Sequence, residues 1–103
     1  MVYRVELTRR AERDLDGIYD WVRHDAPYHS AGWFERLEQA ILSLAQFPER
    51  CPIQERLSSP NRVVRKLLFG RTRYVYRIYF AIFGDVVRVI HIRHAARRDL
   101  RRL

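Results

Sequence analysis

The chain has 103 residues, of which 48% are hydrophobic, and 20 basic against 12 acidic residues give it a formal net charge of +8. A chain of this length can bury a core of its own without disulfides or metals, so residues 1–103 are expected to form a single domain. The sequence has no run of about 18 apolar residues that would predict a membrane span and no signal-peptide pattern, and the single cysteine, Cys51, fits a reducing cytoplasm.

The first half of the sequence predicts one strand and two helices. Residues 2–7 alternate between apolar and polar, which is typical of a strand, and Thr8 can cap a helix whose apolar positions recur as far as Val22. Residues 24–30 break this helix, because Pro27 disfavours a helical residue before it, and Ser30 can cap the next one. The second helix is expected over residues 31–46, and together the two helices form an antiparallel hairpin.

The second half predicts an antiparallel meander. After an irregular, proline-punctuated loop over residues 48–61, three apolar runs follow at residues 62–69, 73–83 and 86–93. Gly70-Arg71 and Gly84-Asp85 each place glycine first in a possible two-residue turn of type II′. The last run is apolar on both faces, which indicates an interior strand. Residues 94–103 are expected to form a short helix or a basic arm.

The element order β-α-α-β-β-β predicts an α+β fold, with a helix hairpin packed on one face of a small, mainly antiparallel sheet. Residues 62–103 contain 12 of the 20 basic residues and only two acidic ones, so the positive charge is concentrated on the meander. Alternation over residues 73–83 places two sets of side chains on opposite faces of the sheet. The expected core set is Tyr74, Tyr76, Ile78, Phe80 and Ile82, and the expected solvent-facing set is Arg73, Val75, Arg77 and Tyr79.

Guanidinium groups beside a phenol suit the binding of phosphate oxygens, carboxylates or stacked bases. Metal binding is not expected, because His91 and His94 are three residues apart in a strand and therefore point to opposite faces. Metal-free cleavage of RNA would require a proton acceptor, a proton donor and cations around the phosphate. The candidates for these roles are Lys66, Arg73, Arg77, Tyr79, His91, Arg93 and His94.

Four segments of the chain resemble, in order, the RelE/ParE superfamily of toxins from bacterial type II toxin–antitoxin systems. They read LTRRAERDLDGIYDWV, WFERLEQAILSLAQFPERCP, VRKLLFGRTRYVYRIYF and VVRVIHIRHAARRD. The resemblance is closer to the ParE-like branch, because the helix hairpin is long and the segment from His94 to Arg97 is similar to the "H-G-x-R" ending of that branch. The resemblance implies no cofactor and no membrane association.

A ParE-like protein is expected to poison DNA gyrase without being an enzyme. It is also expected to form a hetero-oligomer with a cognate, ParD-like antitoxin that supplies an acidic segment. The residues expected to contact the target are Lys66, Arg73, Arg77, Arg93, His94 and Arg97.

The first alternative is a RelE-like endoribonuclease that cuts mRNA on the ribosome. Its catalytic candidates are Arg73, Arg77, Tyr79, His91, Arg93 and His94. Lys66 is the only lysine of the chain, and arginine cannot replace lysine in proton transfer, which disfavours this activity. The second alternative is a basic nucleic-acid-binding module that is unrelated to toxicity.

Overall fold

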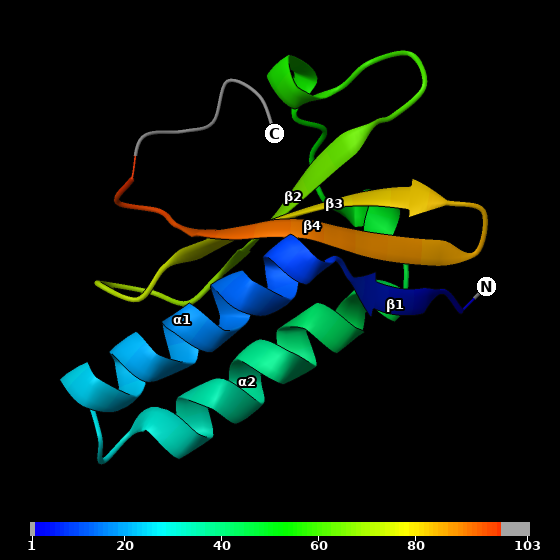
Figure 1. Cartoon of the computed structure of the whole chain (residues 1–103). Helices are drawn as coiled ribbons and strands as arrows, with labels where there is room; N and C mark the ends of the chain where they lie inside the picture. The colour runs from blue at the N-terminus through cyan, green and yellow to red at the C-terminus, as the bar shows by residue number, and fades with distance from the viewer. Residues whose placement is uncertain (1, 98–103) are drawn as a thin grey trace.

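The computed structural model describes residues 2–97. Two helices lie on one face of a four-stranded sheet whose strand order is β1-β4-β3-β2, with β1 parallel to β4 and the other pairs antiparallel (Figure 1). The α+β class, the mainly antiparallel sheet and the interior position of the last strand are thereby confirmed. The elements are β1 Arg4–Leu7, α1 Arg9–Asp25, α2 Ser30–Leu42, β2 Val64–Phe69, β3 Tyr76–Phe83 and β4 Val86–His94.

Helix α1 begins where the sequence predicts, directly after β1. The hydroxyl of Thr8 accepts a hydrogen bond from the Ala11 N–H at 3.1 Å, as an N-cap does. The same hydroxyl donates to the carbonyl of Ile90 at 3.0 Å, and the Thr8 N–H donates to the carbonyl of Val89 at 3.0 Å. One residue therefore caps α1 and attaches its start to β4.

The break between the helices is shorter than predicted. Helix α1 continues to Asp25, and α2 already begins at Ser30. Ser30 is not a cap: it is a buried residue inside the helix, and its hydroxyl donates to the carbonyl of Pro27 at 3.2 Å. None of the described helices combines the length and the apolar character that crossing a bilayer requires.

Helix α2 also ends earlier than predicted, at Leu42, and a 3₁₀ turn follows over Ser43–Ala45. The Ser43 hydroxyl donates to the carbonyl of Ala40 at 2.6 Å, a local bond that competes with the continuation of a helix. The loop predicted to be irregular contains two more 3₁₀ turns, Pro48–Arg50 and Glu55–Leu57.

The turn between β2 and β3 is wider than predicted. Pairing stops at Phe69 opposite Tyr76, so residues 70–75 form the connection and Arg73 lies in this loop rather than in the strand. Gly70 has φ 92°, and a Cβ at that position would lie 1.9 Å from the carbonyl oxygen of Tyr74. The loop backbone therefore folds back so closely onto this position that only glycine fits it. The turn between β3 and β4 is the two-residue turn predicted, with Phe83 opposite Val86.

The main core lies between the helices and the sheet. Trp33, Leu37 and Ile41 of α2 pack in one cluster with residues from β3 and β4. The alternation predicted for β3 is confirmed on this face, because the five residues expected in the core all belong to this cluster, either buried or packed against it. They are Tyr74, Tyr76, Ile78, Phe80 and Ile82.

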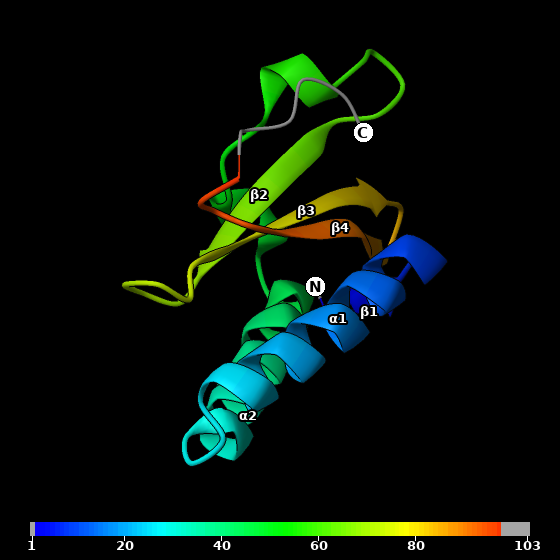
Figure 2. The same ribbon diagram turned by 60° about the vertical axis from the view of Figure 1, so that its left-hand side comes forward.

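The opposite face of the sheet has a small core of its own, which the sequence did not predict. Tyr79 is fully buried there with Leu57 and Val64, and Ile90 packs against them. The segment that carries Leu57 lies on this side, away from the helices (Figure 2). The expectation that Tyr79 presents its phenol on an exposed basic face is wrong, because a segment more than 20 residues earlier folds over that face.

Candidate functional site

A cavity of about 770 Å³ lies between α1 and the ends of β3 and β4. Its helical side includes Gly17, Ile18 and Trp21, and its sheet side includes Tyr76 and Ile92. The remaining lining residues are ionisable: Arg13, Asp14, Arg73, His91, Arg93, His94 and Arg97. Four arginines against one aspartate make this cavity a strongly cationic site.

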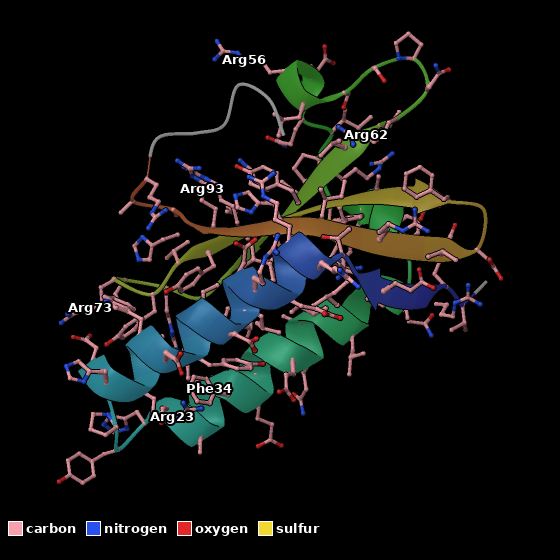
Figure 3. The ribbon with its side chains drawn as sticks, in the orientation of Figure 1. Arg23, Phe34, Arg56, Arg62, Arg73 and Arg93 are labelled. Atoms are coloured by element: carbon pink, nitrogen blue, oxygen red, sulfur yellow. The ribbon has the colours of Figure 1, made fainter. Side chains whose placement is uncertain are left out.

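The cavity brings together four of the six residues predicted to contact the target, namely Arg73, Arg93, His94 and Arg97. Arg77 does not line it but lies opposite Arg93 in the β3–β4 register, and its Nη1 donates to the carbonyl of Arg97 at 3.1 Å. Lys66 lies on β2 opposite Tyr79, outside the cavity. Figure 3 shows Arg93 and Arg73 well apart, with Arg73 near the end of α1.

The sequence analysis did not predict the contribution of α1, because Arg13 and Asp14 are polar residues among the apolar positions of an amphipathic helix. Arg13, Gly17 and Trp21 all line the cavity. Their spacing of four residues places them on one side of the helix. This spacing is the feature of the sequence from which the helical side of the cavity could have been predicted.

Asp14 holds the end of β4. Its Oδ2 accepts a hydrogen bond from the Ile92 N–H at 3.0 Å and lies 2.6 Å from Nδ1 of His91. A carboxylate only accepts, so Nδ1 of His91 must carry a proton, and Nε2 of the neutral ring keeps its lone pair. Burial lowers the pKa of His91, although the carboxylate of Asp14 acts in the opposite direction.

His94 differs from His91 because both of its ring nitrogens are occupied. Nε2 lies 2.7 Å from the carbonyl of Arg73, and Nδ1 accepts from the Ala96 N–H at 3.0 Å. The imidazole therefore donates through Nε2, accepts through Nδ1 and is neutral in this arrangement. It joins the β2–β3 loop to the turn that carries Arg97.

Arg73 is positioned by α1 and by its neighbour in the loop. Its Nη2 lies 3.0 Å from Oδ2 of Asp25, and its guanidinium lies over the ring of Tyr74 at 5.5 Å. The Tyr74 hydroxyl also donates to Asp25. The Arg73 side chain is still 67% exposed, so this ion pair orients the guanidinium without removing it from solvent.

The phenol of Tyr76 remains protonated at neutral pH. Tyr76 lines the cavity, and burial raises its pKa to about 12. Tyr79 is buried on the other face, where its ring stacks with that of His91 at 6.3 Å between centroids. Within residues 2–97, no three or more His, Cys, Asp or Glu side chains are grouped in a way that could hold a metal ion.

Comparisons with known proteins agree on one family. The model of the ParE toxin of the type II toxin–antitoxin system parDE matches residues 5–99. Toxin RelE2 of Caulobacter vibrioides is 36% identical over 94 residues, which cover 91% of this chain and 97% of that protein.

Two solved structures share the fold. A chromosomal ParDE system from P. aeruginosa superposes with a TM-score of 0.70 at 21% identity, covering 90% of this chain and 96% of the other. The archaeal RelE–RelB complex from Pyrococcus horikoshii gives a TM-score of 0.61 at 14% identity, covering 95% and 100% of the two chains.

Proposed function

The chain belongs to the ParE toxin family of type II toxin–antitoxin systems, and on this basis we propose that it arrests growth by poisoning DNA gyrase. The observation that carries the proposal is the match to the ParE-type family model over nearly the whole chain. The cationic cavity supplies the contact surface, with Arg73, Arg93 and Arg97 facing the target. Family membership disfavours a nucleic-acid-binding module unrelated to toxicity.

The arrangement of the proton-transfer candidates supports a binding role over a catalytic one. His94 uses both ring nitrogens within the fold, and Tyr79 is buried away from solvent. Lys66 lies outside the cavity, and the arginines inside it stay protonated, so they provide charge but do not exchange protons. A site of this kind binds an anionic surface well without needing to perform chemistry on it.

One observation favours the alternative, a RelE-like endoribonuclease. Asp14 holds His91 in the tautomer that leaves Nε2 as a proton acceptor, in a cavity lined by arginines, and those are the parts that metal-free phosphodiester cleavage requires. The relative at 36% identity also carries the name toxin RelE2. This activity would depend on His91 and Asp14 rather than on His94 or Tyr79.

We further propose that a cognate antitoxin neutralises the chain as a hetero-oligomer by laying an acidic segment along the cationic cavity. The structural relatives support this, since one is a chromosomal ParDE system and the other is a RelE–RelB complex. Of the described cavity-lining residues, Asp14 is the only acidic one, so the electrostatic match to an acidic segment is good. Both proposed targets place the chain in the bacterial cytoplasm.

Controlled expression in a bacterial host, with and without a co-expressed cognate antitoxin, tests these proposals. We expect growth arrest that the antitoxin relieves, together with loss of gyrase supercoiling activity in vitro. Arg73→Ala, Arg93→Ala and Arg97→Ala should each reduce the arrest. Arg62→Ala is a suitable control, because Arg62 is exposed and lies outside the cavity.

Primer extension on translated mRNA separates the two targets. Unaltered supercoiling together with new mRNA cuts that disappear in His91→Phe would replace the gyrase proposal by the ribonuclease. Harmless expression would reject the proposed toxicity, and equal toxicity of the cavity variants and Arg62→Ala would reject the cavity as the site of action.

A further inference from the structure

A second cavity, of about 490 Å³, lies between the β2–β3 loop and the turn of the helix hairpin. Its lining residues come from the end of α1, the first half of α2, the end of β2 and the loop itself. Among the described residues, none lines both cavities, although the same loop borders them: Arg73 lines the cationic cavity, whereas Thr72 and Tyr74 line the second one. The second cavity is therefore a separate place on the molecule.

The walls of the second cavity are mainly aromatic. Trp33 is only 8% exposed, and its ring contacts two others, with centroid distances of 5.5 Å to Phe69 and 6.1 Å to Tyr74. The Tyr74 hydroxyl donates to Asp25, which fixes the position of that ring. A planar ring that enters this cavity gains edge-to-face contacts in addition to the burial of its own apolar surface.

The ionisable lining residues of the second cavity include two arginines and no described acidic residue. Arg36 comes from α2 and Arg71 from the loop. Within residues 2–97, neither guanidinium forms an ion pair, in contrast to Arg73, which pairs with Asp25. Two positive charges without a carboxylate partner therefore adjoin an aromatic cavity, and this combination favours an anionic ligand.

The two kinds of lining residue require a ligand with two parts. The aromatic walls accept a planar apolar body, and the arginines accept an oxyanion. A carboxylate is planar and matches the fork of a guanidinium with its two oxygens. The volume of the cavity falls within the range that is usual for small-molecule sites, which are mostly apolar and have a few polar groups that orient the ligand.

We propose that the second cavity binds a small aromatic carboxylate. Its ring lies against Trp33, Phe69 and Tyr74, and its carboxylate is held by Arg36 and Arg71. This ligand site goes beyond the proposed action on gyrase and does not depend on it. A neutral aromatic compound lacks the charge that the arginines select, and a saturated carboxylate lacks the contacts between rings.

An NMR titration of the tryptophan indole N–H signals with 2-naphthoate tests the proposal. The chain has two tryptophans, and Trp33 lines the second cavity while Trp21 lines the cationic one, so the two signals report which cavity is occupied. Trp21→Phe identifies the signals. We expect a saturable shift of the Trp33 signal with a Kd below about 1 mM, as is reasonable for a ligand of this size. The Trp21 signal should shift less.

Two matched compounds test the two parts of the ligand. The first, 2-naphthamide, keeps the rings but has no charge, and we expect it to bind about tenfold more weakly. The second, decahydro-2-naphthoate, keeps the charge but has no aromatic ring, and we expect it to bind about threefold more weakly. Equal affinity of either compound and 2-naphthoate overturns the proposal. A larger shift at Trp21 than at Trp33, or no saturable shift, also overturns it.

Variants of the two arginines test the residues that are assigned. Arg36→Gln and Arg71→Gln should each weaken the binding of 2-naphthoate about threefold and leave that of 2-naphthamide unchanged. Arg62→Gln, which changes an exposed arginine outside both cavities, is the control. Unchanged affinity for 2-naphthoate in either variant overturns the assignment. The titration measures binding at Trp33 and the gyrase assay measures supercoiling, so the failure of one proposal is distinguishable from that of the other.

Discussion

Strand β4 continues past the last residue that pairs with β1, and the carboxylate of Asp14 forms a hydrogen bond with the unpaired edge of β4. Pairing with β1 ends at Val89, after which Thr8 bonds the carbonyl of Ile90 and Asp14 accepts the N–H of Ile92. A buried peptide N–H without a hydrogen-bond partner lowers the stability of the fold. The Asp14 side chain supplies the acceptor that a neighbouring strand would otherwise provide. The same oxygen also fixes the ring of His91.

We expect Asp14→Ala to lower the free energy of unfolding by about 2–3 kcal/mol, because it leaves the Ile92 N–H and the His91 ring without an acceptor. Asp14→Asn keeps an acceptor oxygen and should cost less. Urea unfolding followed by tryptophan fluorescence measures both. Asp16→Ala, which removes an exposed carboxylate of the same helix, is the control, and an equal loss in both alanine variants would contradict the role of Asp14.

The pH dependence of stability should contain a component from His91. Burial lowers its pKa in the folded state below the ordinary value of 6.5, so below that value the unfolded chain binds more protons than the folded one. This component is therefore destabilising as pH falls from neutrality through the folded-state pKa, and it is absent at higher pH. The charged and ionisable groups around His91 are Arg10, Asp14, Tyr79 and Arg93.

Unfolding measured in denaturant between about pH 8 and pH 5 checks this component. As the solution becomes more acidic, the free energy of unfolding of the unaltered chain should fall relative to that of His91→Phe. His24→Phe should show the slope of the unaltered chain. A difference that stays constant across the range would exclude a depressed pKa at His91.

At the scale of the elements, the start of α1 depends on one hydroxyl. Thr8 bonds both the first turn of the helix and the carbonyl of Ile90 in β4. This joint fixes the helix against the sheet, and with it the α1 side of the cavity. Residues farther along the helix, such as Arg13 and Trp21, take their positions from this joint.

We expect Thr8→Ala to destabilise the fold by about 1–2 kcal/mol, the usual cost of removing an N-cap hydroxyl. Thr8→Ser retains the hydroxyl and should recover most of that loss. Thermal unfolding of the three proteins measures the difference. If the serine variant is as unstable as the alanine variant, the loss comes from the methyl group of threonine and not from its hydrogen bonds.

At the scale of the whole molecule, the sheet is covered on both faces but unequally. The helices bury the larger core, and the segment around Leu57 covers Tyr79 and Val64 on the other side. Figure 1 shows this segment on the opposite side of the sheet from α1 and α2. The segment is therefore part of the folded unit rather than a surface loop.

Leu57→Ala should lower the free energy of unfolding by about 2–5 kcal/mol, since it opens a cavity against Tyr79. Ile53→Ala, a partly exposed hydrophobic residue of the same segment, should cost much less. Circular dichroism and fluorescence should report one coincident transition in both variants. Separate transitions would show that the segment unfolds independently of the sheet.

The sequence predicts those features that depend on neighbouring residues. Thr8 at the start of α1, the glycine turn at Gly84 and the apolar face of β3 all follow from local chemistry or from a period of two. The burial of Tyr79 could not be predicted in this way, because it depends on Leu57, which is distant in the chain.

The sequence indicates only part of the candidate site. Arg73, Arg93, His94 and Arg97 were predicted to contact the target because they lie on or just after the basic strands, and all four line the cavity. Asp14 was missed, since on the helix it looks like any surface carboxylate. Asp14 differs from the other carboxylates of the helix only in its contact with the end of β4, which is distant in the sequence.

The direct junction of β1 and α1 through Thr8 fixes the rotation of the helix about its own axis. A residue inserted after Leu7 would turn every later side chain of α1 by about 100° relative to the sheet. Asp14 would then swing away from β4, while Arg13 and Trp21 would leave the groove that they border. In this molecule the contacts between α1 and β4 therefore leave no room for a change in the length of that junction.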